Sequence, residues 1–190
     1  MDIFTAIKER RSCRNFLPDP VASHVLEKIL EAGTWAPSAA NNQPWEFIVV
    51  TNTAVKEGIF MESEKCRKAL FEKSGWKWVD RYKIGFLNEA PVIIAVIGDP
   101  KKTGADMFLE GGGLAYQHGC AAAIQNMLLA AHALGLGTLW FTLFEKETIR
   151  KTLKIDQAKE PLALICLGKP AVPSSPTPRK GVKEMTSYVP

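Results

Sequence analysis

The sequence predicts a single α+β layered domain with about four strands and four or five helices. Four short runs rich in β-branched and aromatic residues predict the strands, at residues 45–51, 92–98, 137–144 and 162–168. Around them, apolar residues recur at three- and four-residue spacings, which indicates helices. A chain of 190 residues with 46% hydrophobic residues is long enough to bury one substantial core.

The first half of the chain alternates helices and loops. Apolar residues at helical spacing predict a short N-terminal helix that ends near the arginines of residues 10–14. A second helix is expected over residues 23–32, with Gly33 as its stop. Two prolines and two asparagines make residues 36–44 a loop, and residues 54–74 are expected to form a helix.

The second half contains two segments with two interpretations each. Residues 75–88 place two Trp, a Tyr and a Phe among charged residues. We interpret this segment as a mobile lid that covers a ligand, and the alternative is an amphipathic helix. Residues 116–134 form a helix that is apolar nearly all round, so one buried side could face another subunit. A short charged helix follows at 145–153. The tail, residues 170–190, has five prolines and three serines, and its composition predicts disorder.

The net charge of +4 lies at the chain ends. Residues 1–20 carry +1, residues 169–190 carry +3, and the body between them is neutral. A nucleic-acid-binding protein more often has a basic stripe through its folded body, so no nucleic-acid partner is expected. Two basic ends that meet in space would instead form a local anion site.

The cysteines and histidines indicate the cellular location and whether a metal site is expected. The four cysteines include no CxxC pair, so we expect a reducing, cytoplasmic location. His118 and Cys120 are neighbours without a third ligand at metal spacing, so no metal site is expected. The longest apolar run, residues 127–144, contains a histidine and two glycines and is interpreted as buried core, with no membrane span.

The segment Arg10-Arg11-Ser12-Cys13-Arg14 concentrates hydrogen-bond donors. Three guanidiniums and a hydroxyl suit a phosphate, although a solvated helix end is the alternative. The cations could lower the pKa of Cys13, or this cysteine could be an apolar filler. No GxSxG motif, paired carboxylates or nucleophile–base pair stands out, which favours a bound cofactor as the carrier of the chemistry.

Four motifs in order resemble the nitroreductase family of FMN-dependent oxidoreductases. They are RRSCRNF at 10–16, APSAANNQPW at 36–45, QNMLLAAHALGLGTLW at 125–140, and GKP at 168–170 followed by Arg179-Lys180. The resemblance implies a three-layer domain with a central, mainly antiparallel sheet flanked by helices. It also implies a homodimer with FMN at the interface. Residues 1–170 would form the FMN-binding domain, and an ordered arm, residues 171–190, would extend onto the partner subunit.

The resemblance also implies the flavin-binding residues. One subunit would supply Arg10, Arg11, Ser12 and Arg14, and the partner would largely supply Pro37, Ser38, Ala39, Asn41 and Gln43. Trp140, Phe141 and Thr142 would pass the reactive flavin nitrogen, with a backbone N–H near Phe141 or Thr142 facing it. Arg179 or Lys180 would close on the phosphate.

The implied reaction passes a hydride from NAD(P)H through FMN to a small electron-poor acceptor in a ping-pong cycle. The acceptor would be a nitroaromatic, quinone or enone, with Trp76 and Trp78 as candidate stacking residues and no catalytic side chain required. The alternatives are a flavin-dependent dehalogenase, a flavin-fragmenting enzyme of the same fold, and a flavin-storage protein with little turnover. The chain departs from the family pattern at His118-Gly119, often acidic, and at Thr142-Leu143, often Gly-Gly.

Overall fold

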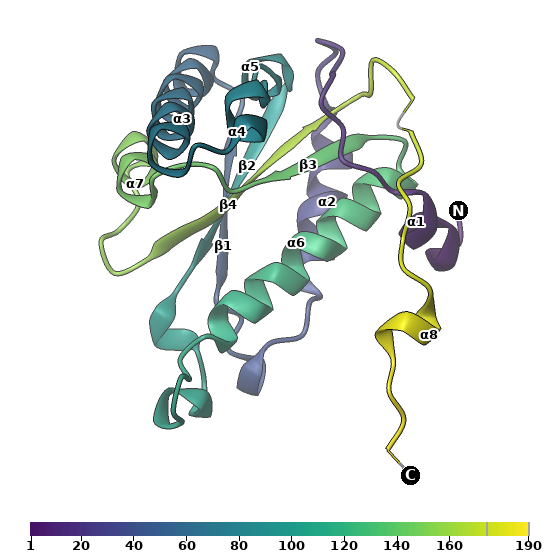
Figure 1. Cartoon of the computed structure of the whole chain (residues 1–190), viewed down its shortest axis with the longest axis vertical. Helices are drawn as coiled ribbons and strands as arrows, with labels where there is room; N and C mark the ends of the chain where they lie inside the picture. The colour runs from purple at the N-terminus through teal and green to yellow at the C-terminus, as the bar shows by residue number, and fades with distance from the viewer. Residues whose placement is uncertain (174, 190) are drawn as a thin grey trace.

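The computed structural model describes residues 1–173 and 175–189 (Figure 1). Its centre is a sheet of four strands in the order β1-β2-β4-β3, and every neighbouring pair is antiparallel. The strands are β1 (Trp45–Val50), β2 (Val92–Gly98), β3 (Gly137–Phe141) and β4 (Glu160–Gly168). The predicted α+β fold with an antiparallel sheet is confirmed.

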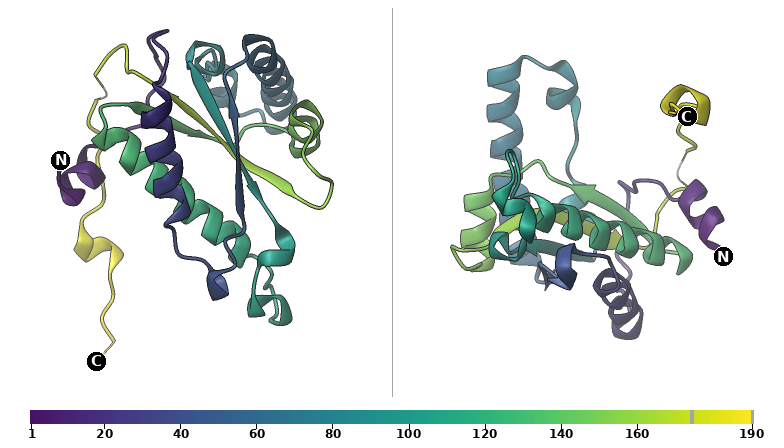
Figure 2. Two further views of the ribbon diagram at one scale, coloured as in Figure 1. Left: turned by 180° about the vertical axis from the view of Figure 1, so that it is seen from behind. Right: turned by 90° about the horizontal axis from the view of Figure 1, so that it is seen from below.

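Helices cover both faces of the sheet. They are α1 (Ile3–Glu9), α2 (Ser23–Thr34), α3 (Thr53–Ser74), α4 (Lys77–Arg81), α5 (Phe86–Glu89), α6 (Ala115–Ala133), α7 (Lys146–Leu153) and α8 (Val182–Met185), with short 3₁₀ turns η1 (Ala39–Asn41), η2 (Pro100–Lys102) and η3 (Ala105–Phe108). Figure 2 shows α2 and α3 on opposite sides of the sheet. Among the described residues, none of these helices has the length and hydropathy needed to cross a membrane.

The inner strand β2 contributes side chains to two hydrophobic cores, one on each face of the sheet. Along β2 every residue is buried, because alternate side chains point to opposite, covered faces. Ile93, Ala95 and Ile97 pack with side chains of α3, α5 and α7. Val92, Ile94 and Val96 pack against α2 and α6 instead. The result is the predicted three-layer arrangement of helix, sheet and helix.

Helix ends follow local chemistry, with one exception. Asp2 accepts hydrogen bonds from the N–H groups of Phe4 and Thr5 at 2.9 and 3.1 Å, which caps α1. Gly75, at φ +66°, ends α3 in the left-handed region. The prediction that Gly33 ends the second helix is wrong: Gly33 is buried inside α2, where a Cβ would lie 3.0 Å from the Met127 side chain. This glycine allows close packing of α2 on α6.

Three other segments differ from the sequence prediction or extend it. The third strand ends at Phe141, so residues 142–144 lie outside it. Residues 75–88 form two short helices, α4 and α5, and Phe86 and Leu87 are buried in the core. Figure 1 shows residues 175–189 running past α1 and away from the sheet.

Candidate functional site

The Arg10–Arg14 segment follows α1 and lies along the start of β3. The Cys13 N–H donates to the Thr138 carbonyl at 2.8 Å, and Ser12 forms a parallel bridge with Thr138. Further along, the Leu17 N–H donates to the Lys169 carbonyl at 2.9 Å. These backbone contacts bring the N-terminal segment beside the start of the C-terminal tail, so the two basic ends of the chain meet.

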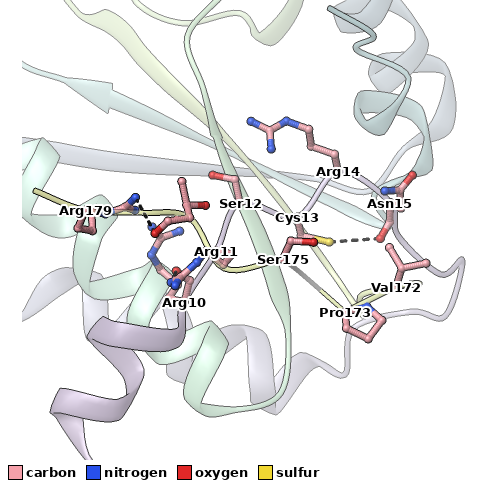
Figure 3. Close-up of a pocket in the computed structure, with 11 residues that line it drawn as sticks. Arg10, Arg11, Ser12, Cys13, Arg14, Asn15, Val172, Pro173, Ser175 and Arg179 are labelled. Atoms are coloured by element: carbon pink, nitrogen blue, oxygen red, sulfur yellow. Dashed lines mark hydrogen bonds between the residues drawn. The ribbon is translucent and has the colours of Figure 1, made fainter.

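A cavity of about 590 Å³ opens where these ends meet, and we call it the arginine cavity. Its lining consists of Arg10, Arg11, Ser12, Cys13, Arg14, Asn15, Val172, Pro173, Ser175, Thr177 and Arg179. Figure 3 shows Arg10, Arg11 and Arg179 gathered together, with the Arg14 side chain apart from them. The structure therefore brings together the predicted arginines and Ser12, whereas Lys180 does not line this cavity.

The guanidiniums of the arginine cavity have no compensating carboxylate among residues 1–173 and 175–189. None of the four forms an ion pair, whereas Arg67 and Arg150 each pair with a glutamate. Burial lowers the pKa of Arg10, and the charges of Arg11 and Arg179 lower it further. A bound dianion would relieve this repulsion, so the donor set fits a phosphate group.

Arg11 also has a structural role. Its Nη1 donates to the carbonyls of Lys8 and Arg10 at 2.7 and 2.8 Å, which caps the C-terminal end of α1. Its Nε is buried without a hydrogen-bond partner among the described residues. Arg11 therefore fixes the turn that carries the other arginines.

Cys13 is a packing residue. Burial raises the pKa of its thiol, and this effect exceeds the opposing effect of Arg14. A Cβ on Gly137 would lie 2.8 Å from the Cys13 sulfur, so the two residues are in close contact. The hypothesis of a thiol activated by its cationic neighbours is wrong, and the alternative of an apolar filler agrees with the structure.

Arg14 connects the arginine cavity to a neighbouring hollow. Its guanidinium lies 5.9 Å from the centre of the Tyr82 ring, at cation–π distance. Arg14 and Asn15 also line a cavity of about 580 Å³ together with Arg81, Tyr82, Lys83, Gly85, Phe86 and Glu89. Sequence reasoning missed Arg81 and Lys83, and the mixture of aromatic and basic residues in and just after α4 was the signal available for them.

The loop of residues 37–43 is held in an uncommon backbone conformation. Ala40, Asn41 and Gln43 have φ values of 49°, 54° and 45°, which are unfavourable for residues with a Cβ. The Ser38 hydroxyl accepts a hydrogen bond from the Gln43 N–H at 3.0 Å. Close packing against Gly104 stabilises the shape, since a Cβ there would lie 2.9 Å from the Ala39 side chain. Strain of this kind is concentrated at ligand sites.

Within one chain, this loop and the arginine cavity lie at opposite ends of α6. Ser38 packs near Gly119, at the start of the helix. Arg11 and His132, in the last turn of α6, line a common cavity. Gly119 and His132 are about 20 Å apart along a helix that rises about 1.5 Å per residue. Figure 1 shows the loop and α1 at the two ends of α6. The structure therefore does not bring Pro37, Ser38, Ala39, Asn41 or Gln43 to the arginines of the same chain.

The third group of predicted residues lies at the outer edge of the sheet. The Thr138 carbonyl faces outward to Cys13, so by strand alternation the N–H of Trp140 also faces outward and that of Phe141 faces β4. Thr142 follows directly after the last residue of β3. Of the two candidates for the flavin contact, the N–H of Phe141 is directed toward β4, which leaves that of Thr142. Trp140 is 39% exposed, whereas the Phe141 side chain is buried.

Trp76 and Trp78 are exposed side by side, with ring centres 6.0 Å apart. Ring contacts at 5.6–6.2 Å continue through Tyr82 and Phe86 to Phe141 in β3. This aromatic row connects the two exposed tryptophans to the strand that carries the predicted flavin contact.

The Nitroreductase family model matches residues 7–169. A Methanothermobacter thermautotrophicus protein with the provisional name NADH dehydrogenase/NAD(P)H nitroreductase is 34% identical, over 90% of this chain and 78% of the relative. The 5,6-dimethylbenzimidazole synthase of Rhodospirillum rubrum is 29% identical, over 86% of this chain and 83% of its own length. A crystal structure of a provisionally named nitroreductase in complex with FMN, from Desulfovibrio desulfuricans, has a TM-score of 0.78 and 29% identity, covering 100% of this chain and 98% of that one.

Proposed function

Because this chain belongs to the nitroreductase family, we propose that it is an FMN-dependent oxidoreductase. In the proposed ping-pong cycle, NAD(P)H reduces the flavin and leaves, and an electron-poor nitroaromatic, quinone or enone then accepts the hydride. The FMN bound by a relative with 29% identity supports the choice of cofactor. Bound FMN supplies the hydride chemistry, so the chain itself has to bind, orient and shield the reactants.

The observation that carries this proposal is the uncompensated charge of the arginine cavity. Arg10 and Arg179 lie close enough for their charges to interact, and Ser12 adds a hydroxyl donor beside them. We assign the phosphate to Arg10, Arg11 and Arg179, and the ribityl chain or polar ring edge to Ser12 and Arg14. The Lys180 ammonium is a weaker candidate because it does not line the cavity.

From the arginine cavity, the free edge of β3 supplies the remaining donors. The outward N–H of Trp140 lies along this edge beyond Thr138, and the N–H of Thr142 follows just past the end of β3. We assign them to the polar atoms of the ring, with Trp140 providing a flat apolar surface against one face. Backbone donors in a strand are fixed in direction, so they orient a planar ligand without loss of side-chain entropy.

A homodimer would complete the site. The loop of residues 37–43 is distant from the arginines of its own chain, and an antiparallel pairing of two α6 helices would place it beside those of the partner. The surface next to α6 supports such a contact, because Phe4 and Trp35 are each 80% exposed there. An apolar cavity of about 400 Å³ there is lined by Ile3 and Ala6 of α1, by Trp35 and by residues of α6. The arm, residues 171–190, would then extend over the partner.

The absorption spectrum of the purified protein tests the proposal. We expect a yellow protein that releases FMN, and not FAD, on denaturation. It should oxidise NADH or NADPH when menadione is present. A colourless protein that cannot be reconstituted with FMN would refute the cofactor assignment, and a yellow protein with almost no turnover would indicate flavin storage.

The relative named 5,6-dimethylbenzimidazole synthase supports a second candidate, an oxygen-dependent enzyme that consumes its own flavin. Product analysis of the reduced holoprotein under air and under nitrogen separates the two functions. Loss of FMN with a new benzimidazole product, under air only, would favour the second candidate. Release of halide from a halogenated aromatic under nitrogen would instead indicate a dehalogenase.

A further inference from the structure

A cavity of about 270 Å³ lies between α6 and the outer edge of β3, and we call it the β3 cavity. It is lined by Trp140 of β3 and by Thr142 just beyond this strand, and from α6 by Gln117 and His118. Trp140 and Thr142, which are assigned above to the flavin ring, therefore share this cavity with a histidine.

His118 is available for chemistry. The side chain is exposed near the start of α6, and its ring forms no ion pair with any described residue. The backbone N–H of His118 donates to Leu114 within the first turn, so the helix fixes the residue while the ring remains free. An exposed imidazole can donate and accept hydrogen bonds, and histidine is the side chain that most often serves as a general acid or base in enzymes.

The other lining groups cannot replace it. Burial raises the pKa of the Cys120 thiol to about 12, which makes it a poor acid at neutral pH. Gln117 and Thr142 carry amide and hydroxyl groups, which donate hydrogen bonds but do not give up protons near pH 7. Ala121, Ile124 and Leu162 are apolar. Of the residues described as lining the β3 cavity, His118 alone combines an acidic N–H with exposure.

We propose that His118 is a catalytic residue that donates a proton to the oxygen of the acceptor as the acceptor is reduced; this inference rests on the function proposed above. When hydride reaches a quinone, enone or nitro group, negative charge develops on an acceptor oxygen. The imidazolium N–H bond breaks, an O–H bond forms, and the electron pair remains on the ring. Water then returns a proton to the exposed imidazole. In sum, NAD(P)H and one proton reduce the acceptor by two electrons.

Two substitutions separate proton donation from hydrogen bonding. His118→Gln keeps a donor but cannot give up a proton, whereas His118→Phe removes both functions. His24→Gln, on the exposed face of α2, is the matched control. Two acceptors are compared in each FMN-loaded variant: menadione, which takes up a hydride and a proton, and ferricyanide, which takes electrons without a proton. FMN content is measured in every preparation.

We expect both His118 variants to lose about 100-fold in menadione turnover, the lower range for general acid catalysis. Ferricyanide reduction and FMN content should stay at wild-type values. A binding measurement adds a readout independent of turnover: benzamide, a neutral and non-reducible aromatic carbonyl, is titrated while the flavin absorbance is followed. The benzamide Kd should be unchanged in H118Q and raised about 5- to 10-fold in H118F, the value of one hydrogen bond.

Each alternative result has one meaning. Full menadione turnover in H118Q, equal losses with both acceptors, or an unchanged benzamide Kd in H118F would overturn the role of His118 while leaving the proposed oxidoreductase intact. A wild-type protein that binds no FMN, or that reduces neither acceptor, would instead refute the proposed function, and the role of His118 with it.

Discussion

Replacing Arg10 by alanine should have opposite effects on the free and the FMN-bound protein. In the free protein, the pKa of Arg10 is lowered by burial and by the charges of Arg11 and Arg179, so its charge is unfavourable there. In the bound protein, the same guanidinium would donate to a phosphate dianion. The variant should therefore bind FMN more weakly without being less stable in its absence.

The two effects differ in size. A hydrogen bond between charged groups contributes about 1.5–3 kcal/mol, so loss of Arg10 should raise the Kd of FMN by about 10- to 150-fold. Relief of repulsion in the free protein is worth at most about 1 kcal/mol, because the side chain is partly exposed. For a chain of this length, that corresponds to a rise in Tm of no more than about 2–4 °C.

Thermal unfolding with and without FMN measures both effects in one series, and quenching of flavin fluorescence gives the Kd. Lys183→Ala, which removes one charge from the exposed helix α8, is the matched control and should change neither value. An R10A variant with wild-type FMN affinity would refute the phosphate assignment. A free R10A protein that melts several degrees lower would refute the claim that the cluster is repulsive.

Three more predictions concern packing, pH and the aromatic row. Gly137→Ala would place a Cβ 2.7 Å from the Cys13 Cβ, so it should displace the arginine segment and lower FMN content; full flavin loading would contradict this. The pKa of Cys120 is raised to about 12 by burial, so its contribution to the free energy of unfolding is complete below about pH 9 and is lost as the pH rises toward 12. Urea unfolding of Cys120→Ala should therefore depend less on pH in that range, and a pH dependence identical to that of the wild type would show that burial does not raise the thiol pKa in the folded state. Trp76→Ala and Trp78→Ala should raise the KM for aromatic acceptors while leaving ferricyanide reduction unchanged; unaltered acceptor specificity in both variants would end the lid hypothesis.

The sheet was predictable because its strands carry a strong local pattern. Val92–Gly98 is a β-branched run whose bounds agree with the sequence prediction. The role of Gly33 was not predictable, since a glycine after an apolar helix is also the commonest helix stop. Only the packing of Met127 against it, from almost a hundred residues away, decides between the two roles.

Some residues of the candidate site were predictable from the sequence, and others were not. The arginines and Ser12 form one continuous motif, and the structure places them around one cavity. Arg81 and Lys83 reach a neighbouring cavity through the fold of α4 and α5, which has no clear sequence period. The positive φ values of Ala40 and Asn41 also could not be predicted from the sequence, because tertiary packing imposes this loop strain.

The separation of the 37–43 loop from the arginine cavity along α6 has a genetic consequence. If each flavin site takes its arginines from one subunit and its loop from the other, two inactive variants should complement each other. A mixed dimer of R10A and a loop variant such as S38P would contain one doubly damaged site and one intact site. Co-expression should therefore restore wild-type flavin affinity to about half of the sites in the mixed dimers, although in each variant alone every site is weakened.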